Sequence, residues 1–177
     1  MTGQNNNTAL YHNAMRYGTL LGAIWSIMYI LMFIGVGNTL LSICFIILFI
    51  GSPFIAAALA NRYKKKECNG CLKYMQAWVF TYCMYICASI LSAVVMLIYL
   101  KYIDNGMFFS SIQEILEEFI KIPGLDTATI QQLEAASTII TNTTTNDFVW
   151  EQLSNNILSA SLLPFIIAIF VRSNKKE

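Results

Sequence analysis

The sequence predicts an all-α integral membrane protein: a bundle of four transmembrane helices with an extracytoplasmic pair of helices between the third and the fourth. The 177-residue chain is 56% hydrophobic and only 12% charged, whereas soluble domains carry about 25% charged residues. Four apolar stretches are each long enough to supply the roughly 20 helical residues that a bilayer core requires. Lys and Arg residues are also distributed unevenly among the segments that flank and connect these four stretches. The length suits one membrane domain, residues 1–177.

The four predicted spans have no Asp, Glu, Lys or Arg in their central parts, and they cover residues 17–36, 40–60, 74–100 and 148–171. The first stretch is too long, and its leader too poor in positive charge, for a secretory signal peptide. Residues 37–39 read Gly-Asn-Thr and predict a tight turn, so the first two spans should form an antiparallel hairpin. Residues 63–73 and 101–147 are expected to connect the remaining spans.

Charge sets the expected orientation, because short cytoplasmic loops collect Lys and Arg. Only Lys101 and Lys121 fall on one side of the predicted bilayer. The nine basic residues on the other side are Arg16, Arg62, Lys64, Lys65, Lys66, Lys73, Arg172, Lys175 and Lys176. Both termini and the 63–73 loop are therefore expected to be cytoplasmic, and the 101–147 loop extracytoplasmic.

Tyr29 is assigned to the aromatic belt near a helix end, and Trp25 to packing between helices.

Small residues and prolines characterise the spans themselves. Gly18, Gly22 and Ser26 recur at intervals of four, the pattern that lets membrane helices approach closely. Packing within the chain is the simpler interpretation, and a face for a second copy or another membrane protein is the alternative. Pro53 and Pro164 favour kinks. The lack of charge inside the spans argues against an ion-coupled transporter or pump, but not against a neutral or lipid substrate.

The long loop should contain two helices. Residues 107–122 have an amphipathic pattern that stops at Pro123 and Gly124. Asp126 or Thr127 can cap a second helix through residue 140, and residues 141–146 read as a polar hinge. The pair is expected on the bundle mouth or along the membrane interface, and the alternatives are a docking platform or a lid. The apolar face of its first helix consists of Phe108, Ile112, Ile115, Leu116 and Phe119.

Cys68 and Cys71 form the only motif of chemical interest, because two thiolates at this spacing make half of a zinc site. His12, the only histidine, or the same pair from a second chain could complete the site. A redox role would need a βαβ context, which is missing. Reduced thiols without a metal are the simpler expectation. No motif points to a catalytic residue, a cofactor or a nucleic-acid partner, so no enzyme activity is predicted.

Three segments carry a resemblance to a known family. They are residues 70–78, reading Gly-Cys-Leu-Lys-Tyr-Met-Gln-Ala-Trp, residues 99–104, reading Tyr-Leu-Lys-Tyr-Ile-Asp, and a final apolar span that closes with Arg172. Together they resemble the bacterial membrane family of domain of unknown function 4199 (DUF4199), found mostly in the Bacteroidota. The resemblance implies four helices in a bacterial inner membrane, a periplasmic long loop and no assigned activity. Genes of such proteins often neighbour a polyprenyl-phosphate glycosyltransferase, which makes that enzyme a candidate partner.

Two functional hypotheses follow. The first is a non-enzymatic accessory or scaffold subunit that packs against a membrane-protein partner. The second is a small dimeric transporter or lipid-handling protein, whose partners are membrane lipids and a second copy. A polar or roomy cavity near Pro53 and Pro164 would favour the second hypothesis, whereas a filled core with an apolar outer groove would favour the first.

Overall fold

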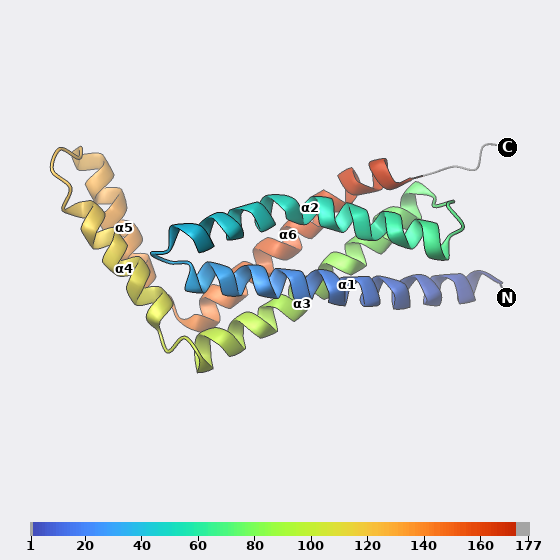
Figure 1. Ribbon diagram of the computed structural model, residues 1–177, viewed down its shortest axis with the longest axis horizontal. Coiled ribbons are helices and arrows are strands. Elements are labelled where there is room, and N and C mark those ends of the chain that lie inside the picture. The colour runs from blue at the N-terminus through green and yellow to red at the C-terminus, as the bar shows by residue number, and fades with distance from the viewer. Residues whose placement is uncertain (1, 173–177) are drawn as a thin grey trace.

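A computed structural model describes residues 2–172, with side chains from residue 8 onward, and over this range the chain is helical with no strands. Its helices are α1 (Thr2–Ile34), α2 (Thr39–Glu67), α3 (Tyr74–Tyr102), α4 (Met107–Ile120), α5 (Thr127–Asn142) and α6 (Thr145–Val171) (Figure 1). The long helices α1, α2, α3 and α6 form the bundle. The shorter α4 and α5 form a hairpin that projects from one end of it. This arrangement confirms the predicted all-α fold.

The turn between α1 and α2 follows directly from its residues. Gly37 has a φ of +80°, a left-handed conformation that glycine adopts without steric cost. Asn38 then caps α2, because its side chain accepts a hydrogen bond of 3.1 Å from the backbone N–H of Leu40. The predicted antiparallel hairpin of the first two spans is therefore present.

The helices extend beyond the predicted spans, so the connections between them are shorter than expected. α1 begins in the polar leader at Thr2, and α2 continues to Glu67, so the connection to α3 is only residues 68–73. Three lysines in the last turn of α2 favour this extension, because cations stabilise a helix C-terminus. The expected hinge at 141–146 is mostly helical, since Thr144 and Asp147 form a capping box that starts α6.

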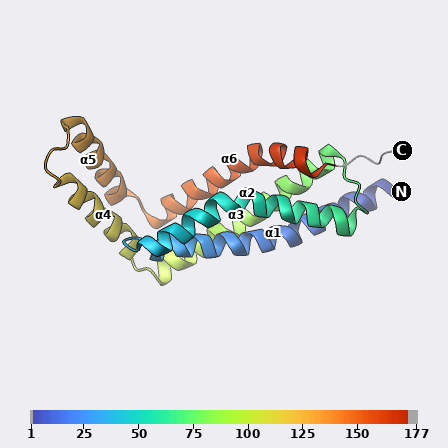
Figure 2. The same cartoon turned by 45° about the horizontal axis from the view of Figure 1, so that its top comes forward.

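α3 is the central helix of the bundle. It packs most extensively against α1 and then α6, whereas α2 packs mainly on α1 and α6 and touches α3 little (Figure 2). An aromatic cluster closes each end of the core. At the end near the chain termini, the rings of Tyr63 and Phe80 stack with centroids 3.9 Å apart. At the end near the α4–α5 hairpin, the rings of Phe33 and Tyr99 stack with centroids 5.4 Å apart.

The α4–α5 hairpin is attached to the bundle mainly through Phe108. This residue is buried, its ring lies 5.0 Å from that of Phe33, and its backbone N–H donates to the Asp104 carboxylate at 2.9 Å. The other residues of the predicted amphipathic face are less covered: Ile112, Ile115 and Leu116 are half-buried, and Phe119 is exposed. α5 has no buried residue. The hairpin therefore contributes little to the core.

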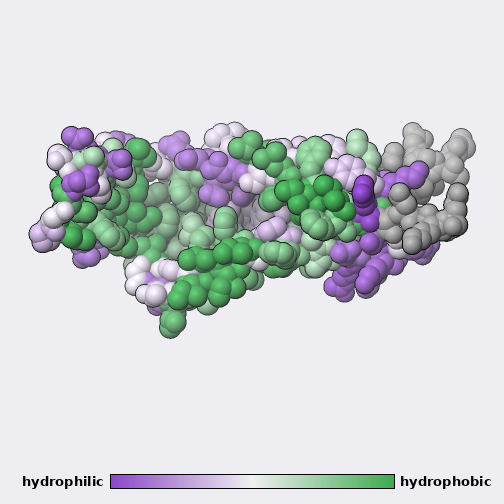
Figure 3. Space-filling view, turned by 90° about the horizontal axis from the view of Figure 1, so that it is seen from above, coloured by the Kyte–Doolittle hydropathy of each residue, from purple (hydrophilic) through white to green (hydrophobic). Residues whose placement is uncertain are grey.

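The four bundle helices are all long and apolar enough to cross a membrane, with spans of 27, 29, 29 and 27 residues. On the face shown in Figure 3, hydrophobic residues cover much of the middle of the bundle, and hydrophilic residues gather near the chain termini and over the hairpin. The α2–α3 connection lies at the same end as the termini, and the hairpin at the opposite end (Figure 1). The charge asymmetry of the sequence thus becomes a difference between the two ends of the molecule.

Candidate functional site

A cavity of about 240 Å³ lies inside the bundle, near the middle of α2, α3 and α6. All four long helices contribute to its wall. The lining residues are Trp25, Met28, Tyr29, Phe49, Ile50, Ser52, Pro53, Tyr85, Asn156, Ser159 and Leu163. The wall contains no Asp, Glu, Lys, Arg or His.

A chain of hydrogen bonds ties α6 to α1 beside this cavity. The Gln152 side-chain amide donates to the Tyr29 hydroxyl at 2.9 Å, and that hydroxyl donates to Asn156 Oδ1 at 3.0 Å. Tyr29 is only 3% exposed. Its assignment to the aromatic belt was therefore wrong, because hydrogen-bonding partners on α6 hold it in the core.

A second polar contact links α1 to α2. The Trp25 indole N–H donates to Ser52 Oγ at 2.6 Å, next to the helix-breaking Pro53. The Trp25 ring also meets the Tyr85 ring edge to face, with centroids 5.4 Å apart. Trp25 thus packs between helices, as the sequence predicts, and it fixes the position of two other cavity residues.

Two side chains of the wall have buried polar atoms without a hydrogen-bond partner. Among the described residues there are three such atoms: Tyr85 Oη, Asn156 Nδ2 and Trp78 Nε1, and the first two belong to the cavity wall. An unsatisfied buried group costs about 1–3 kcal/mol. Native proteins seldom retain such groups without a reason, and a ligand site is one such reason.

The cavity reaches the outer surface between α2 and α6, which pack only lightly on each other. Phe49 and Ile50 are 58% and 62% exposed, and Ser159 is exposed as well. These residues belong to apolar helices that are long enough to cross a membrane.

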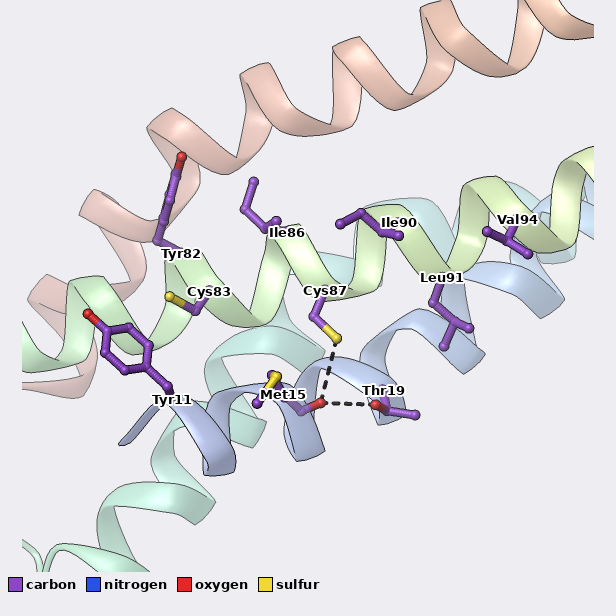
Figure 4. Close-up of a pocket in the computed structure, with 10 residues that line it drawn as sticks. All are labelled: Tyr11, Met15, Thr19, Tyr82, Cys83, Ile86, Cys87, Ile90, Leu91 and Val94. Carbon is purple, nitrogen blue, oxygen red and sulfur yellow. Dashed lines mark hydrogen bonds between the residues drawn. The ribbon is translucent and has the colours of Figure 1, made fainter. Parts of the chain in front are cut away.

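An apolar groove of about 600 Å³ lies elsewhere on the bundle, between α1 and α3 (Figure 4). Two of its polar groups bond within the protein: Thr19 Oγ1 donates to the Met15 carbonyl at 3.0 Å, and Cys87 Sγ contacts the same oxygen at 3.7 Å. The groove thus offers contact area without directional chemistry. Its lining residues are Tyr11, Met15, Thr19, Tyr82, Cys83, Ile86, Cys87, Ile90, Leu91 and Val94.

The small-residue face of α1 is occupied by α3 of the same chain. Gly18, Gly22 and Ser26 are all buried. A Cβ atom added at Gly18 would lie 2.7 Å from Cys87 Cβ, and one at Gly22 would lie 3.0 Å from Leu91 Cδ2. This face is therefore used for packing inside the bundle and is not a free surface for a second copy or another protein.

Cys68 and Cys71 border a different pocket of about 250 Å³ beside Tyr63 and Glu67. Burial raises the pKa of the Cys68 thiol, and a hydrogen bond with Tyr63 offsets only part of that rise. A raised pKa lowers the thiolate fraction that metal binding and redox chemistry require. His12 does not line this pocket. Among the described residues, no group of three or more His, Cys, Asp or Glu side chains is placed to hold a metal ion.

The cavity residues were not predicted from the sequence, although a signal was present. Asn155 and Asn156 stand in an apolar run, and Ser52 precedes a mid-helix proline. Amide and hydroxyl groups in a span normally seek partners on neighbouring helices. Uncharged polar residues within the spans are therefore a signal for this cavity, alongside intramembrane charge.

Comparison with known proteins places the chain in a family. The sequence model of the family described as protein of unknown function (DUF4199) matches residues 16–173. No curated protein and no solved structure matches the chain. The family match includes α1 from residue 16 onward, the other three membrane-length helices, the hairpin and every residue of the cavity wall. The chain therefore belongs to the DUF4199 family of proteins of unknown function, and it is a membrane protein built on a four-helix bundle.

Proposed function

We propose that this protein is a non-enzymatic lipid-handling protein that accepts the polar part of a neutral membrane lipid in the cavity between its four long helices. The observation that carries the proposal is the pair of unpartnered polar atoms, Tyr85 Oη and Asn156 Nδ2, in the wall of a cavity that opens towards the bilayer. The cavity lies beside Pro53, so the core is not filled. That property favours lipid handling over the scaffold hypothesis.

The composition of the wall selects for an uncharged ligand. No charged side chain lines the cavity, and an unpaired charge is costly in the membrane interior. The volume of about 240 Å³ is below the roughly 300–1,000 Å³ of a pocket that encloses a drug-sized ligand. The cavity therefore suits the polar linkage of a lipid, with the hydrocarbon chains remaining in the bilayer.

The same wall gives no support for catalysis. Ser52 and Ser159 are the only hydroxyl nucleophiles of the serine or threonine type in it, and no His or carboxylate among the lining residues could act as their general base. Ser52 also already accepts the Trp25 indole N–H. Binding or transfer of an unchanged lipid fits these groups better than its hydrolysis.

The test is the lipid that stays with the protein during gentle purification. We expect native mass spectrometry of the wild type, extracted in mild detergent, to show a bound neutral lipid, and Asn156→Leu to lose it. Thr19→Val is the matched control, because Thr19 lies in the outer groove and bonds only within its own helix. Absence of lipid from the wild type, or equal retention by Asn156→Leu, would contradict the proposal.

The outer groove favours a second candidate, the accessory subunit. Its apolar lining of about 600 Å³ could receive a helix of a membrane partner, and the family resemblance suggests a polyprenyl-phosphate glycosyltransferase in a bacterial inner membrane. Affinity purification should then recover a specific complex, and Ile90→Trp, which fills the groove, should weaken it. Recovery of a lone monomer or homodimer would count against this candidate.

A further inference from the structure

The hydrogen-bonding groups of the cavity define the chemistry of the ligand more closely. We infer that the cavity recognises a carboxylic ester of a neutral glycerolipid, with the ester oxygens accepting hydrogen bonds from Asn156 and Tyr85. This inference rests on the proposed function. It adds the identity of the recognised group, which the proposal of lipid handling leaves open.

The direction of the hydrogen-bond chain makes Asn156 a donor. Gln152 donates through Nε2 to the Tyr29 oxygen, and the Tyr29 hydroxyl hydrogen is then used on Asn156 Oδ1. This order fixes the orientation of the Asn156 amide and leaves its Nδ2 group without an acceptor. An amide nitrogen can only donate, so a ligand must present an acceptor there.

Tyr85 supplies the second donor from a different helix. Its side chain is only 1% exposed, its ring is held by the edge contact with Trp25, and its hydroxyl has no partner. Tyr85 stands on α3 and Asn156 on α6, two helices that pack extensively on each other. Tyr85 and Asn156 therefore line the same cavity from two helices.

Among neutral lipid linkages, the ester matches this pair of donors best. A carbonyl oxygen has two lone pairs and can accept both hydrogen bonds, and the ester adds a second oxygen. A hydrocarbon offers no acceptor, and an ether oxygen is a weaker one than a carbonyl. The opening is bordered by Phe49, Ile50 and Leu163, which suits the acyl chain that follows an ester.

The layout of the opening also indicates that the ligand should be uncharged and should have an apolar part and a polar part. The apolar Phe49 and Ile50 are exposed at the rim, and Tyr85 and Asn156 are buried deeper in the bundle. A diacylglycerol satisfies this order, because its ester groups stand between the chains and a small uncharged head.

A matched pair of probes tests the inference. The full-length protein, delipidated in detergent, is titrated with a diester diacylglycerol and with the diether analogue that has the same chains and the same free hydroxyl. We expect the wild type to bind the diester about tenfold more tightly, the effect of roughly one net hydrogen bond. Tyr85→Phe and Asn156→Leu should each reduce this preference to about twofold or less, and Thr19→Val should keep it.

Thermal unfolding of the delipidated variants separates binding from folding. Tyr85→Phe removes a buried hydroxyl that has no partner, so its melting temperature should equal or exceed that of the wild type while its preference for the diester falls. A role in folding alone would lower the melting temperature and leave the preference intact.

The outcomes distinguish this inference from the proposed function. Equal affinity of the wild type for diester and diether, or an unchanged preference in both cavity variants, would overturn ester recognition while leaving lipid binding in place. Failure of the wild type to bind either lipid would overturn both.

Discussion

At the scale of single residues, positions inside the bundle have two different roles: some allow close packing of helices, and others place polar groups beside a cavity. Gly18 and Gly22 let α1 and α3 approach closely, because an added Cβ atom at either position would lie within about 3 Å of α3. Asn156 and Tyr85 do the opposite, because they keep polar atoms unpartnered where the helices leave a cavity. The first pair stabilises the packing of the bundle, and the second pair carries the proposed recognition of a lipid.

The close approach of α1 and α3 predicts a cost for the smallest possible enlargement. Gly18→Ala places a methyl group 2.7 Å from Cys87 Cβ and 2.8 Å from the Met84 carbonyl oxygen, and overpacking of this kind costs about 1–3 kcal/mol. We expect a clearly lower melting temperature in detergent. Gly51→Ala is the control, since no atom lies within 4 Å of its added Cβ. An equal loss in both variants would contradict the packing explanation, because an added methyl group at Gly51 meets no neighbour and alanine favours a helix over glycine.

The Cys68 thiol gives a pH prediction at the same scale. Because burial raises its pKa, less thiolate exists at any given pH, and alkylation of Cys68 should need a higher pH than alkylation of the exposed Cys71. Tyr63→Phe should shift the Cys68 profile higher still, because it removes the hydrogen bond that lowers this pKa. Rates measured by mass spectrometry across pH 7–10 (a range of about 1.5 units either side of the ordinary thiol value) test both statements. Coincident profiles for the two thiols would refute the first.

At the scale of helices, the sequence predicts their number and order better than their ends. Apolar length alone identifies α1, α2, α3 and α6, because a bilayer requires it. It cannot locate the ends, since Asn, Thr and Lys continue a helix beyond the apolar stretch, as at Thr2 and Glu67. The burial of Tyr29 also could not be predicted from the sequence, because it depends on hydrogen bonds with Gln152 and Asn156, which lie more than 120 positions away along the chain.

Some helix ends can be predicted from local sequence signals alone. Of the two predicted candidates, Asp126 and Thr127, Asp126 caps α5, and its carboxylate accepts from the Thr129 backbone N–H at 3.2 Å. Hydrogen bonds from the Thr129 side chain and backbone hold the pKa of Asp126 below its ordinary value. Caps are readable from sequence because donor and acceptor lie within one turn.

This cap predicts a local pH dependence. A carboxyl whose folded pKa is depressed stabilises the helix above its unfolded pKa, about 3.9, and the stabilisation is lost as pH falls through the lower folded value. Hydrogen exchange in the first turn of α5 should therefore be slowed at neutral pH and lose protection in strong acid. Asp126→Ala should lose that protection at all pH values, whereas Glu134→Ala in the same helix should behave like the wild type. Wild-type-like exchange in Asp126→Ala would contradict the role of the cap.

At the scale of the whole molecule, the bundle is asymmetric along its length and around its circumference. One end gathers the chain termini and the α2–α3 connection, and the other bears the hairpin (Figures 1 and 2). Around the circumference, α1 and α3 enclose an apolar groove, whereas a second cavity, with exposed lining residues on α2 and α6, contains buried polar groups in its wall. The charge pattern predicts the first asymmetry, but the second emerges only when the helices are packed.

The end-to-end asymmetry predicts membrane topology. Because basic residues collect near the termini, reporter fusions at residues 1 and 177 should both be active in the cytoplasm. A fusion after Gly124, in the α4–α5 turn, should report the opposite side. A cytoplasmic signal from the Gly124 fusion would contradict the charge-based orientation.

The most direct test of lipid entry between α2 and α6 is photocrosslinking with a neutral diacylglycerol that carries a diazirine on one chain near the ester. Purified protein in bilayer discs is irradiated, and the labelled peptides are located by mass spectrometry. The account predicts that label concentrates around Phe49, Ile50 and Ser159, and that Asn156→Leu reduces it there without changing background labelling around Ile90 in the outer groove. Label spread evenly over the membrane-facing surface, or unaffected by Asn156→Leu, would contradict it.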